Sequence, residues 1–329
     1  MWDGVRAVPH LGWNEGVIHI LHAHGRKRKN LKQYIPFYLA ALPGMIYIFI
    51  NNYMPLPGLV LAFKKYSTKR GIWGSKWVGL SNFEYLFTTQ DAWIITRNTI
   101  GYNLAFIVLN VIFGVLTAIV LSELTSKWKK VYQSVILLPH FLSSVIISYL
   151  VFAFLSAENG FINSTLLPLF GMEEISWYSE PKYWPFILVF VQVWRSIGYN
   201  CIVYLATILG IDRGIYEAAS IDGASKIQQV FQITLPLLKP TIIMITLLAV
   251  GRIFNSDFGL FYRTTRNSSG LYNAFVTLDV YVYNSLFKST IPTYGYASAA
   301  GFIQSVLGCL TLLAANAIVS KVDKENAFF

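Results

Sequence analysis

The feature that most constrains this chain is a series of long apolar segments separated by shorter polar ones. A helix needs roughly 20 residues to cross a hydrocarbon core of about 30 Å, and six segments reach that length. In lipid the backbone polar groups must be satisfied within the segment, so segments of this kind form helices. We therefore expect an all-α, polytopic membrane protein with six transmembrane helices, approximately at residues 35–60, 99–121, 131–155, 183–209, 237–257 and 296–320.

The composition supports a membrane protein. Hydrophobic residues make up 55% of the chain and charged residues only 13%, which is about half the charged fraction of an ordinary soluble domain. The net charge of +10 does not point to nucleic acid, because the basic residues lie beside apolar segments, where Lys and Arg orient membrane proteins. Cys201 and Cys309 lie inside apolar runs and lack the spacing of a disulfide framework or a zinc site.

The polar residues divide the chain into an N-terminal arm, residues 1–30, and a membrane domain, residues 31–329, with a long loop at 210–236. No cleavable signal peptide is expected, because the first apolar run is too long for a signal core. The segments that an internal N-terminus would place inside carry more Lys and Arg than the outer loops, which predicts cytoplasmic N- and C-termini. His19, His22 and His24 in the arm lack a nearby Cys or carboxylate cluster, and we expect no metal site.

The loop 210–236 has the pattern of two short helices. Asp212 can cap the first helix and Ser225 the second, while Gly223 permits a sharp bend between them. Ala218 and Ala219 keep the first helix thin, and apolar residues at helical spacing give the second an apolar face. The loop therefore has a surface suited to binding another molecule, the alternative being an amphipathic segment that lies on the lipid surface.

At this loop the chain resembles the permeases of ATP-binding-cassette importers. Their EAA motif reads Glu-Ala-Ala, three residues, Gly, nine residues, Ile, any residue, Leu-Pro, and every defined position is matched here. The resemblance implies that the loop is a coupling helix, which docks on a separate ATPase and transmits its closure to the membrane helices. The residues expected to contact the ATPase are Glu217, Ala218, Ala219, Asp222, Gly223, Ala224, Ile233, Leu235 and Pro236.

Residues 31–320 resemble the carbohydrate-uptake, maltose-type branch of that family, in the subgroup for complex oligosaccharides. The supporting stretches are VGLSNF (78–83), LLPH (137–140), GFIN (160–163) and VWRSIG (193–198). The resemblance implies a type I importer permease in the bacterial cytoplasmic membrane. Its partners would be a second six-helix permease in a heterodimer, two ATPase subunits that hold ATP and Mg, an extracytoplasmic solute-binding protein and membrane lipids.

We expect no cofactor on this chain and no enzymatic activity of its own. The sequence contains no GxxxxGK[ST] phosphate-binding loop. Hydrolysis of ATP would therefore take place on the partner chain.

Polar side chains inside the predicted spans mark a candidate solute pathway, because such residues are costly in lipid and face protein or a water-filled space. Helical periodicity places those of the fourth span on one stripe, and those of the second and fifth spans on one face each. Amide and aromatic groups suit sugars, whose hydroxyls need hydrogen bonds and whose rings stack on aromatic side chains. The candidate pathway residues are Asn103, Asn110, Gln192, Arg195, Tyr199, Arg252 and Asn255.

The alternative for these residues is hydrogen bonding between helices. We favour it for any single Asn or Ser, and leave pathway, gate and structural roles open for Arg195 and Arg252. Asp257 lies off the fifth-span stripe, near its outer end, and is expected at a mouth or as a loop cap.

Other functions remain as alternatives. A permease for a peptide or another small solute would usually carry more carboxylate within the membrane. A secondary transporter would show internal repeats and a carboxylate relay. A membrane protein without a transport role would need neither the loop motif nor three polar-faced helices.

Overall fold

The computed structural model describes residues 34–88, 90–124, 127–288 and 293–322. The N-terminal arm, with His19, His22 and His24, lies outside the described residues. The chain divides between Pro57 and Gly58 into two compact units. Each unit is described by itself.

The first unit contains one apolar helix and its continuation. The helix α2 (Ile35–Ile48) has a Pro in its first turn, where the missing N–H costs nothing, and a second Pro, Pro43, in its interior. It continues through a π-helical turn, η2 (Phe49–Tyr53), and the 3-10 turn η3 (Leu56–Phe63) crosses the boundary between the units.

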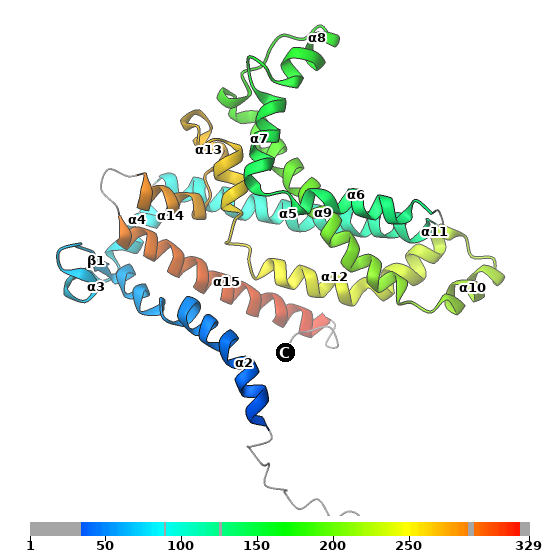
Figure 1. Cartoon of the computed structure of the whole chain (residues 1–329), viewed down its shortest axis with the longest axis horizontal. Helices are drawn as coiled ribbons and strands as arrows, with labels where there is room; N and C mark the ends of the chain where they lie inside the picture. Colours follow the sequence, from blue (N-terminus) through cyan, green and yellow to red (C-terminus); the bar gives the residue numbers. More distant parts are fainter. Residues whose placement is uncertain (1–33, 89, 125–126, 289–292, 323–329) are drawn as a thin grey trace, which may run out of the picture. The chain divides into compact units, whose positions relative to one another are not determined.

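The second unit is helical apart from two short antiparallel strands among its described residues. The long helices α5 (Gln90–Glu123) and α9 (Trp184–Leu209) run side by side (Figure 1). The helix α6 (Lys129–Phe141) packs along α9, and α12 (Leu235–Val250) packs against α9 and α15 (Tyr294–Val322). The elements are β1 (Lys64–Lys65), α3 (Gly71–Gly74), β2 (Lys76–Trp77), α4 (Ser81–Thr88), α5 (Gln90–Glu123), α6 (Lys129–Phe141), α7 (Ser144–Leu155), η4 (Ile162–Leu166), α8 (Leu167–Leu169), η5 (Trp177–Ser179), η6 (Pro181–Tyr183), α9 (Trp184–Leu209), α10 (Arg213–Ile221), α11 (Lys226–Gln229), η7 (Val230–Thr234), α12 (Leu235–Val250), η8 (Gly259–Arg263), η9 (Ser269–Leu271), α13 (Tyr272–Phe275), α14 (Leu278–Phe287) and α15 (Tyr294–Val322).

The expected all-α membrane architecture is confirmed. Within the described residues, five helical segments are long and apolar enough to cross a membrane, and a bent pair of helices would make a sixth span. The five segments are Ile35–Phe63, Asp91–Glu123, Pro181–Leu209, Lys226–Val250 and Tyr294–Lys321, and the bent pair is Lys129–Phe141 with Ser144–Leu155.

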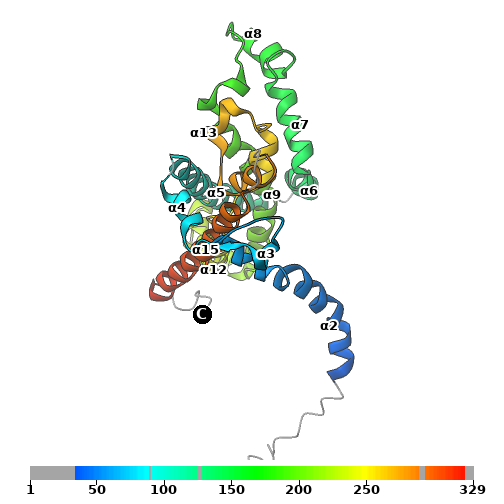
Figure 2. The ribbon, with the colours of Figure 1, turned by 90° about the vertical axis from the view of Figure 1, so that its left-hand side faces the viewer.

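The third predicted span, at 131–155, is broken into two helices in the structure. The helices α6 and α7 meet at an angle of 97°, and α7 rises away from α6 in Figures 1 and 2. Pro139 lies in the last turn of α6, Leu142 is extended, and the Ser143 hydroxyl accepts a hydrogen bond from the Ile146 N–H as the cap of α7. The hydropathy pattern showed no sign of this break, because the segment is apolar on both sides of it.

The fifth span ends earlier than the predicted residue 257, because α12 ends before the unwound segment 251–257. The backbone carbonyls of the unwound segment, which a continued helix would have bonded internally, accept hydrogen bonds from side chains instead. The Asn103 amide donates to the carbonyls of Ile253 and Asn255, both at 2.9 Å, and the Gln304 amide donates to that of Phe254 at 2.9 Å. Irregular backbone at membrane depth is tolerated where neighbouring groups satisfy it in this way.

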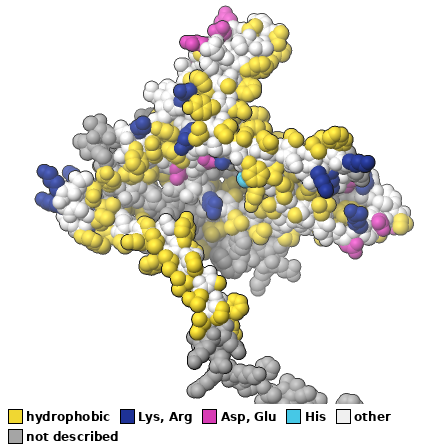
Figure 3. Space-filling model, viewed as in Figure 1, with side chains coloured by type: hydrophobic (Ala, Val, Ile, Leu, Met, Phe, Trp, Pro, Cys, Tyr) yellow, Lys and Arg dark blue, Asp and Glu magenta, His cyan; other side chains and the backbone are white. Residues whose placement is uncertain are grey.

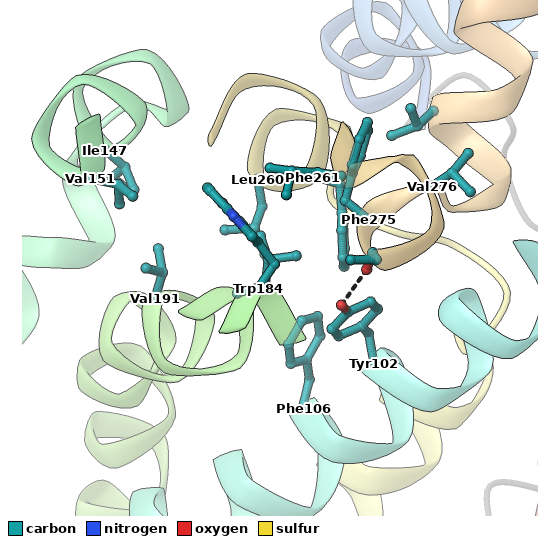
Figure 4. Close-up of a cluster of buried hydrophobic side chains, with 14 of the residues drawn as sticks. Tyr102, Phe106, Ile147, Val151, Trp184, Val191, Leu260, Phe261, Phe275 and Val276 are labelled. Atoms are coloured by element: carbon teal, nitrogen blue, oxygen red, sulfur yellow. Dashed lines mark hydrogen bonds between the residues drawn. The ribbon is translucent and has the colours of Figure 1, made fainter. Parts of the chain in front are cut away.

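An aromatic core fixes the segment that follows the unwound one. Trp184 of α9 and Phe261 of η8 are fully buried in a cluster that also includes Phe275 of α13 (Figure 4). The Tyr102 hydroxyl of α5 donates to the Ala274 carbonyl within this cluster. The segment beyond α12 is therefore held against the helices α5 and α9.

The surface of the second unit agrees with a membrane environment. Charged side chains gather around α10 and α11 and near the β1–β2 hairpin, whereas the long helices between them present mostly hydrophobic side chains (Figure 3). Large apolar residues such as Leu116 and Phe190 are exposed on α5 and α9. Apolar surface between polar ends is what lipid contact requires.

The orientation of the helices stays a prediction, which cysteine labelling can check. In a background with Cys201 and Cys309 replaced by Ser, single cysteines at the exposed positions Ser81 and Thr165 should react with an impermeant thiol reagent added to intact cells. A cysteine at Ser225 should react only after the cells are opened. Labelling of Ser225→Cys from outside would contradict cytoplasmic termini. The same expectation for Ser289 lies outside the described residues.

Candidate functional site

The predicted pathway residues converge on one polar cavity of about 700 Å³. Side chains of α5, α9 and α12 and of the unwound segment line it, so residues more than a hundred positions apart in the chain meet there. Arg195 does not line the cavity itself, but it contacts a residue that does. Six of the seven candidate residues form part of the wall: Asn103, Asn110, Gln192, Tyr199, Arg252 and Asn255.

Two of these residues make hydrogen bonds between segments. The Asn103 amide is committed to the carbonyls of the unwound segment, and Asn110 Oδ1 accepts a 2.6 Å hydrogen bond from the Ser196 hydroxyl across α5 and α9. Bonds of this kind are the alternative weighed for Asn residues inside the spans. They hold the wall of the cavity in place.

Other polar groups at the cavity have no protein partner among the described residues. Gln192 Oε1 and the Tyr204 hydroxyl are buried without one, and the Tyr199 side chain is 54% exposed and stacked on His140, with ring centroids 5.0 Å apart. A buried polar atom without a partner is costly, so these groups favour a polar solute. Tyr204 and Asn200 also line the cavity and were missed from the sequence; they follow Ser196 at intervals of four residues along α9.

An ion pair ties α9 to the unwound segment. Arg195 Nη1 lies 2.6 Å from Asp257 Oδ2, and the two side chains are 25% and 29% exposed. Asp257 Oδ1 also accepts from the Leu260 N–H at 3.0 Å and so caps η8, which is the capping role expected for it. Its pairing with Arg195, 62 positions away in the sequence, was not predicted. Pairing lowers the cost of both charges at this depth.

Asp279 was missed as a second carboxylate near the cavity. Its Oδ2 accepts from the Ser256 N–H at 2.6 Å and from the Ser256 hydroxyl at 2.8 Å, and the Gln304 amide approaches it at 3.3 Å. Asp279 therefore holds the unwound segment at Ser256, next to the residue that pairs with Arg195. It belongs to α14, a helix of only 10 residues, which is too short to be recognised as a span.

The loop 210–236 forms the helix pair that the sequence predicts. Asp212 caps α10 by accepting from the Gly214 N–H at 2.9 Å. Gly223 has a φ of +81° and turns the chain. Ser225 and Gln228 form a reciprocal capping box at the start of α11.

Side-chain contacts brace this helix pair. The Tyr216 hydroxyl lies 2.9 Å from Thr234 Oγ1, and the Gln229 amide donates to the Ser220 hydroxyl at 2.8 Å. An exposed ion pair between Lys226 and Glu123, at 3.0 Å, connects α11 to the end of α5. The loop is thus a structured body attached to the long helices.

The braced pair presents a mixed apolar and acidic surface. Ile221 is 86% exposed and Ile227 is 71% exposed, which is costly for large apolar side chains unless something covers them. The Glu217 carboxylate is exposed and has no ion-pair partner among the residues described. Of the expected contact residues, Glu217, Ala218, Asp222, Gly223 and Pro236 are exposed, and Ala219, Ala224, Ile233 and Leu235 are half-buried.

Comparison with known proteins gives one family and several full-length relatives. Residues 110–324 match the family model of the binding-protein-dependent transport system inner membrane component. Protein LplB of Bacillus subtilis (strain 168) is 34% identical over 296 residues, which cover 88% of this chain and 90% of the relative. YteP of the same organism, a polygalacturonan/rhamnogalacturonan transport system permease protein, is 32% identical over 310 residues, which cover 92% and 94%.

Solved structures agree with these relatives. A chain of a bacterial ABC transporter involved in the import of the acidic polysaccharide alginate superimposes with a TM-score of 0.81 at 28% identity, covering 90% of this chain and 98% of that one. A second structure shows the bacterial alginate transporter in complex with a periplasmic protein bound to an alginate pentasaccharide. It gives a TM-score of 0.81 at 29% identity, covering 91% and 99%.

Proposed function

The chain belongs to the family of binding-protein-dependent transport system inner membrane components, and we propose that it forms half of the pathway through which an ATP-driven importer moves an oligosaccharide. Members of this family are membrane transport components and not enzymes. The chain is accordingly a multi-pass membrane protein. The proposed location is the bacterial cytoplasmic membrane.

The observation that carries the proposal is the polar cavity among apolar helices. A volume of about 700 Å³ accommodates sugar rings, and its wall offers amide, hydroxyl and aromatic groups rather than a relay of carboxylates. Tyr199 presents a ring face for stacking, while Gln192 and Tyr204 present polar atoms without a described partner. The polygalacturonan permease and the alginate importer, which transport carbohydrates, support this choice of solute.

The cytoplasmic loop supports coupling to a separate ATPase. The pair α10 and α11 exposes Glu217, Ile221 and Ile227 on a braced body, and α11 continues through η7 into α12. The unwound segment that lines the cavity follows α12 directly. A displacement of the loop would therefore move α12, and α12 would move the segment that lines the cavity.

The family name itself implies a solute-binding protein, and a periplasmic protein accompanies the alginate transporter in its complex. We extend this to a complete assembly of this chain, a second permease, two ATPase subunits and a binding protein. This chain would bind no nucleotide or metal, because ATP and Mg would lie on the ATPase subunits.

The test is ATP-dependent uptake by the assembly, purified through a tag on this chain and reconstituted in liposomes. Oligosaccharide uptake should require ATP on the side of the liposome membrane that carries the ATPase subunits. It should also require the binding protein. Arg195→Ala should lower solute-stimulated ATPase activity several-fold while the subunits stay together, because it leaves the Asp257 charge unpaired beside the cavity.

Each alternative gives a different result. Uptake driven by an ion gradient without ATP would indicate a secondary transporter. Stimulation by a peptide, with none by oligosaccharides, would indicate a peptide permease. Normal transport by Arg195→Ala would remove this residue from the pathway, and dissociation of the subunits would assign it a structural role.

A further inference from the structure

One cation at the polar cavity lacks a partner within the described chain. Asp257 is paired with Arg195, at 2.6 Å, and the Asp279 carboxylate, which keeps its negative charge, accepts hydrogen bonds from Ser256 and Gln304. Arg252 is an exposed residue that lines the cavity, and its guanidinium group makes no ion pair or hydrogen bond to any described residue. The wall therefore carries one guanidinium group without a described partner.

A second cavity, of about 320 Å³, has the same character. It lies between α7 and η8 and is lined by Ser148 and Tyr149 on one side and by Arg263 and Arg266 on the other. No carboxylate belongs to its described lining. Arg266 stacks on the Phe152 ring at 4.2 Å, and Arg263 forms no ion pair within the described ranges.

One stretch of chain connects the two cavities. It starts at Arg252 in the unwound segment, passes through Asp257 and η8, and reaches Arg266. It carries three guanidinium groups and a single carboxylate, which already has its own cation. Unpaired charges close to the hydrocarbon core are costly and mark a path for a charged partner.

Resting on the proposed function, we propose that the transported oligosaccharide is acidic and that Arg252 binds a sugar carboxylate in the larger cavity. A guanidinium group binds a carboxylate through two parallel hydrogen bonds, which gives both affinity and orientation. Arg263 and Arg266, at the smaller cavity, offer a second binding site for negatively charged groups. One of the compared proteins, the alginate importer, is described as importing an acidic polysaccharide.

The experiment compares two saccharides that differ only in charge. The probes are trigalacturonate and its carboxyl-reduced counterpart, a neutral galactotriose, binding to the purified complete complex in phosphatidylcholine nanodiscs. These nanodiscs contain no anionic lipid that could occupy the arginines. Saturation-transfer NMR titration at low ionic strength should show at least tenfold tighter binding of trigalacturonate, and 0.5 M NaCl should reduce this preference.

Variants assign the preference to one side chain. Arg252→Gln should bring the two affinities to within about twofold by weakening the binding of trigalacturonate, and Arg252→Lys should keep part of the preference. The matched control is Arg70→Gln, which removes the same charge at an exposed position outside both cavities. It should bind both saccharides as the unmodified complex does.

Equal binding of the two saccharides, or a preference that survives Arg252→Gln, would overturn the acidic-substrate proposal and leave carbohydrate transport standing. If Arg252→Gln instead separated the two permeases and left the preference intact, Arg252 would serve subunit pairing and the proposal would fail. Binding of neither saccharide would count against the proposed function and against this proposal with it.

Discussion

Replacing Glu217 with Lys, or Gly223 with Val, should abolish co-purification of the ATPase while the two membrane subunits stay together. Glu217 is an exposed carboxylate on α10, so its reversal leaves the fold intact but opposes a complementary partner surface. Such a reversal costs on the order of 2–5 kcal/mol where the contact is buried and paired. Uptake and stimulated ATPase activity should be lost with it.

Gly223→Val acts through the backbone. Gly223 has a φ of +81°, and an added Cβ would meet nothing within 4 Å, so the penalty comes from backbone conformation and not from a clash. A β-branched residue in this region costs on the order of 1–3 kcal/mol. The loop should relieve this strain by changing the angle between α10 and α11, which misplaces the docking surface.

Matched controls separate loss of docking from general damage. Glu158→Lys reverses an exposed carboxylate at a turn outside the loop, and Gly171→Val imposes the same strain at a φ of +65° in a similarly open position. Both should retain the ATPase. The loop would not be the coupling site if Glu217→Lys and Gly223→Val complexes also retained it and transported at the unmodified rate.

Gly198→Ala should destabilise the membrane domain severely, although it adds only a methyl group. A Cβ at this position would lie 2.2 Å from the Ile136 carbonyl oxygen and 2.8 Å from the Leu137 Cα. These are backbone atoms of α6, which no rotamer change can move. The helices α6 and α9 would have to separate, and overpacking of this kind costs about 1–3 kcal/mol and sometimes more.

Fluorescence-detected size-exclusion melting checks this expectation. Gly198→Ala should lower the melting temperature by on the order of 10 °C or prevent recovery of folded protein. Gly101→Ala in α5 is the matched control, because its Cβ would meet nothing within 4 Å. Melting of the two variants at similar temperatures would show that α6 and α9 do not pack as closely as the structure places them.

The sequence predicted the local features of the loop well. The caps at Asp212 and Ser225 and the turn at Gly223 depend on residues within a few positions of one another, and all three appear in the structure. Helical periodicity likewise placed the polar stripe of α9 and the Asn residues of α5 on a common cavity wall. Interactions with short sequence separation leave a readable pattern.

Helix ends inside the apolar segments were less predictable. The break between α6 and α7, at 97°, and the early end of α12 both lie in stretches where hydropathy stays high. At the second site, the unwound carbonyls are satisfied by Asn103 and Gln304, which come from distant helices. Hydropathy reports the environment of a segment but not which neighbour satisfies its backbone.

The sequence by itself therefore determined that the chain spans a membrane with about six helical segments, and that the loop at 210–236 forms a capped and bent helix pair. Only the tertiary structure decided how the charges pair: that Arg195 meets Asp257, that Asp279 holds Ser256, and that Arg252 is left without a carboxylate among the described residues. The physical reason is the separation in sequence between the residues that interact. Apolarity, capping and glycine turns act between neighbours in the chain, whereas the partner of a charge inside the membrane is set by packing between helices that are distant in sequence.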